Sequence, residues 1–105
     1  MKLRLAPNTL RLRLSAAEVA TFAATGEVAE TIHFAPGQSL RYALERTEAA
    51  PAVAVRYEPG RLTVLVPPAV ADAWTGSAQV TMHHEPAPES SALRILVERD
   101  LDCTH

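Results

Sequence analysis

The sequence of 105 residues contains one cysteine, four glycines and few aromatic residues, which make up 5% of it. The single cysteine, Cys103, cannot form a disulfide within the chain, so packing must hold the fold together. No apolar run approaches the roughly 18–20 residues that a membrane-spanning helix requires. Charged residues interrupt the N-terminal stretch MKLRLAPNTLRLRL where a signal peptide would be continuously apolar. We therefore expect a cytoplasmic protein.

Strong charge of either sign is also absent. Ten basic and twelve acidic residues give a formal net charge of −2, and hydrophobic residues make up 48% of the chain. This composition favours neither a disordered chain nor a strongly basic nucleic-acid binder. The length suits one domain, and we expect a single domain over residues 1–105.

An internal repeat is the main feature that is present. Residues 1–39 shifted by 52 positions, and residues 40–46 shifted by 53, are identical to the later sequence at 12 of 46 positions. The clearest match places LRYALER over LRILVER, and Phe22 and Val28 match Trp74 and Val80. The sequence therefore predicts a duplication, with repeats 1–52 and 53–105.

Each repeat is predicted to form a ββαββ unit. Leucines alternate with Lys2 and arginines over residues 1–5 and 10–14, which is typical of strands with one buried face, and APNT between them predicts a hairpin turn. Ser15 and Glu18 form a capping-box pattern for a helix that ends at Gly26. Strands are expected over residues 28–34 and 40–46, separated by APGQ. In the second repeat PPAVADAW is the expected helix, and residues 84–91 are expected to form a surface loop.

The fold class predicted from these elements is a strand-rich α+β protein. A unit of about 52 residues is at the lower limit for burying its own apolar surface, so the two units should share a core. We expect one pseudo-twofold barrel or sandwich with two short helices outside it. The predicted core consists of Leu10, Leu12, Leu14, Phe22, Val28, Leu40, Leu44, Leu62, Val64, Val66, Trp74, Val80, Leu93, Ile95 and Val97.

Two resemblances to known families follow from these segments. VAVRYEPGRLTVLVPPAVADAW resembles the swapped-hairpin domains of the AbrB/MazE type, which include bacterial transition-state regulators and antitoxins, through Gly60-Arg61, Pro67, Val70 and Trp74. In that family two ββαββ chains interlace as a dimer, so the resemblance implies an equivalent of that dimer inside one chain. The whole chain is also similar to a family of small bacterial proteins of unknown function, through LRLRLS, LRILVE and a nearby cysteine.

A basic face is the first candidate site. Pairing the first hairpin around its turn places Arg4 opposite Arg11 and Lys2 opposite Arg13. One interpretation is an anion-binding patch for DNA or for an acidic protein partner. The other is a solvated strand face, with Glu45 or Glu98 of neighbouring strands supplying the opposite charge.

The second candidate is a metal site at the C-terminus. Cys103 and His105 supply a thiolate and an imidazole, which suit zinc or copper, and His33, His83 or His84 would have to complete the ligand set. His83 and His84 are neighbours in an expected strand, so only one of them can face a given metal. A free thiol beside an unrelated histidine is the alternative.

No catalytic constellation is recognisable in the sequence. It has no glycine-rich phosphate loop, no H-E-x-x-H and no nucleophile beside a base and an orienting acid. We therefore predict a non-enzymatic binding module that needs no cofactor, with a metal-binding protein as the alternative. The protein is expected to be a monomer with an internal pseudo-dimer, or a weak homodimer.

Overall fold

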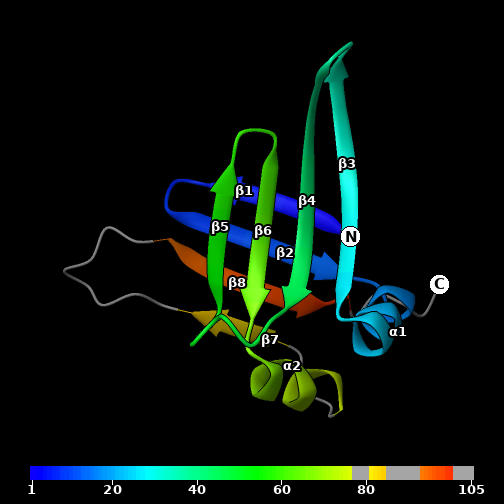
Figure 1. Ribbon diagram of the computed structural model, residues 1–105, viewed down its shortest axis with the longest axis vertical. Coiled ribbons are helices and arrows are strands. Elements are labelled where there is room, and N and C mark those ends of the chain that lie inside the picture. The colour runs from blue at the N-terminus through cyan, green and yellow to red at the C-terminus, as the bar shows by residue number, and fades with distance from the viewer. Residues whose placement is uncertain (77–80, 85–92, 101–105) are drawn as a thin grey trace.

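The computed structural model of the chain describes residues 1–76, 81–84 and 93–100, which form eight strands and two helices (Figure 1). In chain order these are β1 (Lys2–Ala6), β2 (Thr9–Leu14), α1 (Ala16–Thr25), β3 (Glu27–Ala35), β4 (Gln38–Arg46), β5 (Ala54–Glu58), β6 (Arg61–Val66), α2 (Pro68–Thr75), β7 (Thr81–His84) and β8 (Arg94–Arg99). The strand-rich α+β class predicted from the sequence is confirmed. His84 ends β7 instead of starting a loop, and residues 85–91 of the expected loop lie outside the described residues.

Three hairpins turn through the same dipeptide pattern. Proline is followed by Asn8, Gly37 or Gly60, whose φ angles are 57°, 74° and 78°. Proline supplies the negative φ of the first turn position, and asparagine and glycine tolerate the positive φ of the second. These turns set the register of the hairpins β1–β2, β3–β4 and β5–β6.

The helix α1 begins and ends as its sequence predicts. The Glu18 N–H donates to Ser15 Oγ at 3.2 Å, and the Ser15 N–H donates to Glu18 Oε1 at 2.8 Å, which completes the capping box. Gly26 ends the helix at φ 81°, and its N–H donates to the Phe22 carbonyl. The helix α2 follows Pro67 and has no side-chain cap.

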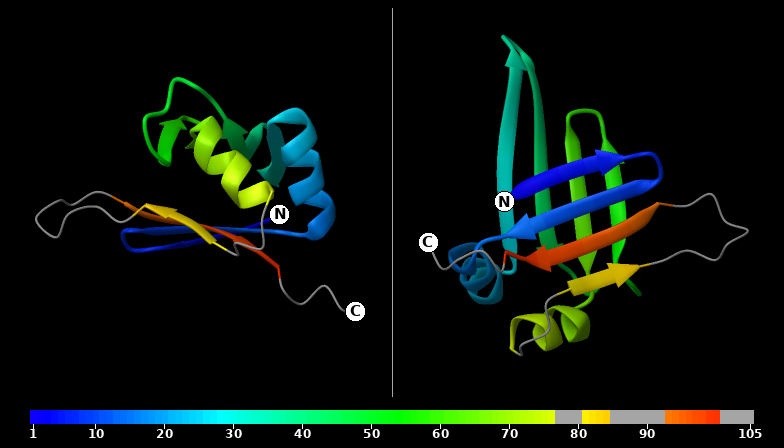
Figure 2. Two further views of the ribbon diagram at one scale, coloured as in Figure 1. Left: turned by 90° about the horizontal axis from the view of Figure 1, so that it is seen from below. Right: turned by 180° about the vertical axis from the view of Figure 1, so that it is seen from behind.

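The strands form two four-stranded sheets. The first sheet has the order β1-β2-β8-β7 and the second β3-β4-β6-β5. In each sheet two antiparallel hairpins are joined at the centre by a parallel pair, β2 with β8 or β4 with β6. Figure 1 shows the strands of one sheet crossing those of the other, and Figure 2 shows both helices on the side of the first sheet that faces the second. The opposite face of the first sheet carries no other described element.

The parallel pairs of the two sheets have the same register. Thr9 faces Arg94 in the first sheet, and Arg41 faces Arg61 in the second. Arg61 follows Thr9 by 52 residues, and Arg94 follows Arg41 by 53, which are the offsets of the sequence repeat. Each sheet therefore takes one hairpin from each half of the chain, and these hairpins meet in the same way.

The strand pairing differs by two residues from one part of the predicted repeat. Val28 faces Leu44 and Met82 faces Val97. Leu44 and Val97 lie 53 residues apart and their partners Val28 and Met82 lie 54 apart, whereas the predicted repeat matches Val28 with Val80, which lies outside the described residues. The difference arises after the helices, because Val28 follows the end of α1 by three residues and Met82 follows the end of α2 by seven.

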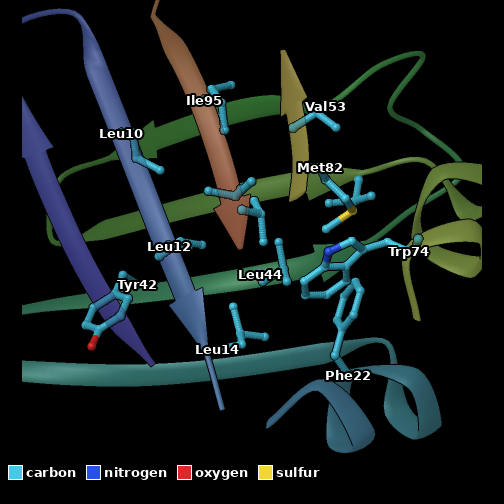
Figure 3. Close-up of a cluster of buried hydrophobic side chains, with 14 of the residues drawn as sticks. Leu10, Leu12, Leu14, Phe22, Tyr42, Leu44, Val53, Trp74, Met82 and Ile95 are labelled. Atoms are coloured by element: carbon cyan, nitrogen blue, oxygen red, sulfur yellow. The ribbon is translucent and has the colours of Figure 1, made fainter. Parts of the chain in front are cut away.

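The core lies between the two sheets and extends to the helices (Figure 3). The predicted burial is confirmed for ten side chains that are at most 8% exposed and form one cluster: Leu10, Leu12, Leu14, Phe22, Leu44, Leu62, Val64, Val66, Trp74 and Val97. Ile95 is also buried, Val28, Leu40 and Leu93 are half-buried against the cluster, and Val80 lies outside the described residues. The sequence analysis missed Tyr42, Val53 and Met82, which are buried in the same cluster.

Candidate functional site

The predicted basic face lies on the outer side of the hairpin β1–β2. Lys2 is paired with Arg13 and Arg4 with Arg11, as expected from the turn. The alternate residues Leu10, Leu12 and Leu14 of β2 point to the opposite side and are at most 1% exposed. Burial of the leucines therefore forces the cations outward, since successive side chains of a strand point to opposite faces. We call Lys2, Arg4, Arg11 and Arg13 the basic face.

All four side chains of the basic face line one shallow depression of about 70 Å³. Lys2 and Arg4 are exposed, and Arg11 and Arg13 are half-buried. The right-hand view in Figure 2 shows this hairpin on the uncovered side of the molecule. The four cations therefore surround a single accessible space.

One carboxylate contacts the basic face in the described part of the chain. Arg11 Nε lies 2.9 Å from Glu98 Oε1, although the two atoms are not aligned for a hydrogen bond. Glu98 reaches this position because β8 lies beside β2 and pairs it with Arg13. Lys2, Arg4 and Arg13 form no ion pair with a described residue. Of the two glutamates expected to supply opposite charge, Glu98 does so and Glu45 does not.

The corresponding hairpin of the second sheet, β5–β6, has balanced charge. There Arg56 faces Thr63, at the position where Arg4 faces Arg11. Arg56 lies 3.7 Å from Glu45 and 3.5 Å from Glu58, measured between guanidinium nitrogen and carboxylate oxygen. Arg61 lies on the same outer face, opposite Glu58. Two cations with two described carboxylates on this face contrast with four cations and one described carboxylate on the basic face.

Two further side chains belong to the same surface. Arg94 and Leu96 alternate along β8 with the buried Ile95 and Val97, which places them on the outer side beside Arg11. The sequence analysis missed them because β2 and β8 are far apart in the sequence and pair in parallel. Arg94 extends the positive surface, and Leu96 places an apolar group within it.

The start of β1 is anchored by a small polar cluster. The Met1 amino group donates to Glu18 and, at 2.8 Å, to Glu30 Oε1. The Tyr42 hydroxyl donates to the Met1 carbonyl at 2.6 Å and lies 2.9 Å from Glu30 Oε2. These contacts join β1 to α1, β3 and β4, and they set the position of the residue that precedes Lys2.

The same contacts shift three pKa values. Partial burial alone would lower the pKa of the Met1 amino group, but its hydrogen bonds to Glu18 and Glu30 outweigh this and raise it above 8.0. Burial alone would raise the pKa of Glu18, but the amino group and the Ser15 N–H outweigh it and lower the value below 4.5. Burial and the neighbouring Glu30 raise the pKa of Tyr42 to about 12.

The residues of the predicted metal site are for the most part not placed. Cys103 and His105 lie outside the described residues, and His83 and His84 are placed only by their backbone in β7. His33 is exposed on β3, an edge strand of the second sheet. In the described ranges 1–76, 81–84 and 93–100, no three histidine, cysteine, aspartate or glutamate side chains lie together so that they could hold a metal ion.

The fold and the basic face together define a strand-rich α+β protein of two crossed four-stranded sheets with one strongly cationic surface. The chain belongs to a family of unknown function, DUF7009, whose model matches residues 1–105. No curated protein and no solved structure matches the chain. Neither described helix is long and apolar enough to cross a membrane.

Proposed function

We propose that this protein is a non-enzymatic binding module that contacts an anionic partner through its basic face. The observation that carries the proposal is that Lys2, Arg4, Arg11 and Arg13 line one uncovered depression, and among the described residues one carboxylate, Glu98, contacts them, through Arg11. Like charges directly opposite each other across a sheet destabilise it by about 0.2–1 kcal/mol per pair. An anion in the depression would relieve this repulsion.

The second hairpin indicates that a cationic outer face is not a general feature of this fold. The outer face of β5–β6 occupies the matching position and has Thr63 and Leu65 where the first hairpin has Arg11 and Arg13. The outer face of a hairpin therefore does not require four cations in this architecture. The cations of β1–β2 are a property of one sheet, which supports a specific role for that surface.

An acidic protein surface is the partner that these features support best. The net charge of −2 disfavours attraction to nucleic acid over the molecule as a whole. Leu96 and Glu98 within the basic surface would meet a phosphate backbone unfavourably, whereas protein interfaces combine apolar and charged contacts. DNA remains the competing anion, because a positive strand face can also bind phosphates.

The test is a titration of two fluorescent probes with the full chain, a peptide of ten glutamates and a short DNA duplex, at about 50 and about 200 mM salt. The variant pair is Arg4→Glu with Arg11→Glu against Arg56→Glu with Arg61→Glu, which makes the same change of charge at exposed positions on the outer face of the other hairpin. We expect the first pair to abolish peptide binding and the second to leave it unchanged. Equal effects of both pairs, or binding of neither probe at the lower salt, would contradict the proposal.

We also infer that the chain is a duplicated ββαββ unit whose hairpins are exchanged between the two sheets, as in swapped-hairpin domains of the AbrB/MazE type. The support is the shared register of the two parallel pairs at the offsets of the sequence repeat. The test is to express residues 1–52 alone, with residue 53 onward removed. A folded homodimer of this half would support the inference, and an unfolded monomer that also fails to assemble with residues 53–105 would contradict it.

A further inference from the structure

The strand β1 is the edge of the first sheet beside the basic face. Its hairpin turns through two residues, so the pair that flanks the turn, Ala6 and Thr9, exchanges hydrogen bonds, and alternate pairs do the same. The N–H and C=O groups of Leu3 and Leu5 consequently point away from β2. No described residue hydrogen-bonds to them. The edge of β1 therefore offers the backbone pattern that a further strand would pair with.

The second sheet extends beyond this edge. The strands β3 and β4 have nine residues each, and at about 3.3 Å per residue they are about 30 Å long. Four strands about 4.8 Å apart span only about 15 Å between the outermost two. Because the sheets cross, the first sheet covers only part of the hairpin β3–β4. Figures 1 and 2 show the ends of β3–β4 and β5–β6 projecting past β1.

The projecting part of the second sheet is apolar on its inner side. Phe34 is 66% exposed, Tyr57 70% and Leu5, on β1 itself, 57%. With the partly buried Leu40 and Leu93 they line an open groove of about 520 Å³. Of these, Phe34 and Tyr57 belong to the strands that project past β1, on the side where a fifth strand of the first sheet would lie.

We propose that this groove and the free edge of β1 bind an extended segment of a partner protein as a fifth strand of the first sheet, with acidic and apolar residues in alternation. The apolar side chains would cover Leu5, Phe34 and Tyr57. The acidic side chains would lie on the outer side, beside Lys2 and Arg4. The proposal rests on the proposed function and identifies its partner class.

Three independent features of the surface indicate the same class of partner. Backbone pairing requires an extended peptide, the groove requires apolar residues at every second position, and the cations require acidic residues between them. A nucleic acid supplies the negative charge but neither the strand backbone nor the apolar side chains. The matching edge strand β5 has its outer Arg56 paired with Glu45 and Glu58 and so lacks the third feature.

The experiment uses the full chain, labelled with ¹⁵N, and a blocked ten-residue peptide that alternates glutamate and valine. A peptide of the same composition with five glutamates followed by five valines is the control for alternation. Binding is measured by fluorescence anisotropy, and amide hydrogen exchange is followed residue by residue. We expect the alternating peptide to bind more tightly and to slow exchange of the Leu3 and Leu5 amides.

Two variants of Leu5 test the backbone contact. In Leu5→Pro the lost N–H points to the edge and is not needed by the hairpin, so the fold should tolerate it, and circular dichroism and thermal unfolding check this. Leu5→Ala removes the same side chain but keeps the N–H, and it is the control. We expect Leu5→Pro to weaken binding of the alternating peptide about tenfold and Leu5→Ala to weaken it less, whereas equal weakening by both would contradict the backbone contact. Lys2→Glu with Arg4→Glu, which keeps the edge intact, should also weaken binding about tenfold.

The outcomes separate this inference from the proposed function. If both peptides bind equally and need Lys2 and Arg4, but the Leu3 and Leu5 amides stay unprotected, strand addition is wrong and binding of an anionic partner stands. If only a DNA duplex binds, strand addition is also wrong and the partner is nucleic acid. If no anionic probe binds, both proposals fail.

Discussion

The rings of Phe22 and Trp74 meet edge to face, with their centroids 6.2 Å apart and their planes at 65°. They come from α1 and α2, at positions that match in the sequence repeat, and both are at most 1% exposed. The contact joins the two helices within the core cluster (Figure 3). The two halves of the chain thus share a core at this point.

This contact predicts that the two helices are coupled in stability. Phe22→Ala or Trp74→Ala should each lower the free energy of unfolding by about 3–5 kcal/mol, because each leaves a cavity in the core. In a double-mutant cycle with the milder changes Phe22→Leu and Trp74→Leu, urea unfolding should give a coupling energy of about 0.5–1.5 kcal/mol. Strictly additive effects would show that the ring contact adds nothing beyond burial.

The amino-terminal cluster predicts a dependence of stability on pH. The lowered pKa of Glu18 stabilises the folded state above pH 4.5, and this contribution is lost as the pH falls through the lowered value. The raised pKa of the Met1 amino group stabilises it below pH 8.0, and this contribution is lost as the pH rises through the raised value.

Glu18→Gln tests this dependence, since glutamine can keep the capping box but carries no charge. The difference in unfolding free energy between wild type and Glu18→Gln should be largest between pH 4.5 and 8.0 and shrink on both sides. Urea unfolding from below pH 4.5 to above pH 8.0 measures it, and Glu48→Gln, at an exposed position without an ion pair in the described ranges, is the control. A difference that does not change with pH would contradict the role of charge.

Tyr42 is expected to anchor the start of β1. Tyr42→Phe removes the hydroxyl that contacts the Met1 carbonyl and Glu30, and it should lower the free energy of unfolding by about 1 kcal/mol. Thermal or urea unfolding measures the loss. The comparison is Thr21→Val, which removes an exposed hydroxyl that bonds only to the Ala17 carbonyl of its own helix. It should lower the free energy of unfolding by less than Tyr42→Phe does.

Glu98 is expected to compete with the anionic partner. Because it is the carboxylate beside Arg11, Glu98→Gln should tighten binding of an acidic peptide about two- to fivefold, in line with a partly exposed ion pair. Glu45→Gln is the matched control on the second sheet and should have no effect on that binding. Weaker binding by Glu98→Gln would mean that Glu98 orients Arg11 for the partner.

The sequence was sufficient to predict the features that depend on neighbours in the chain. Alternation of leucines with cations and the proline-containing turns predict the register of β1–β2, and Ser15 with Glu18 predicts the start of α1. The parallel pairs were not predictable, because no local pattern indicates that β2 lies beside β8. For this reason Arg94 and Leu96 were missed, and Glu45 was assigned to the wrong surface. The projecting apolar residues Phe34 and Tyr57 were missed for the same reason, since their exposure depends on where the two sheets cross.

The most direct test of the basic face is to map the binding of the ten-glutamate peptide by backbone amide chemical shifts of the full chain. The account predicts that the largest shifts occur at Lys2, Arg4, Arg11 and Arg13, that they diminish as salt is added, and that the matching positions Ala54, Arg56, Thr63 and Leu65 hardly change. Shifts of equal size on both hairpins, or the largest shifts on the second sheet, would contradict it.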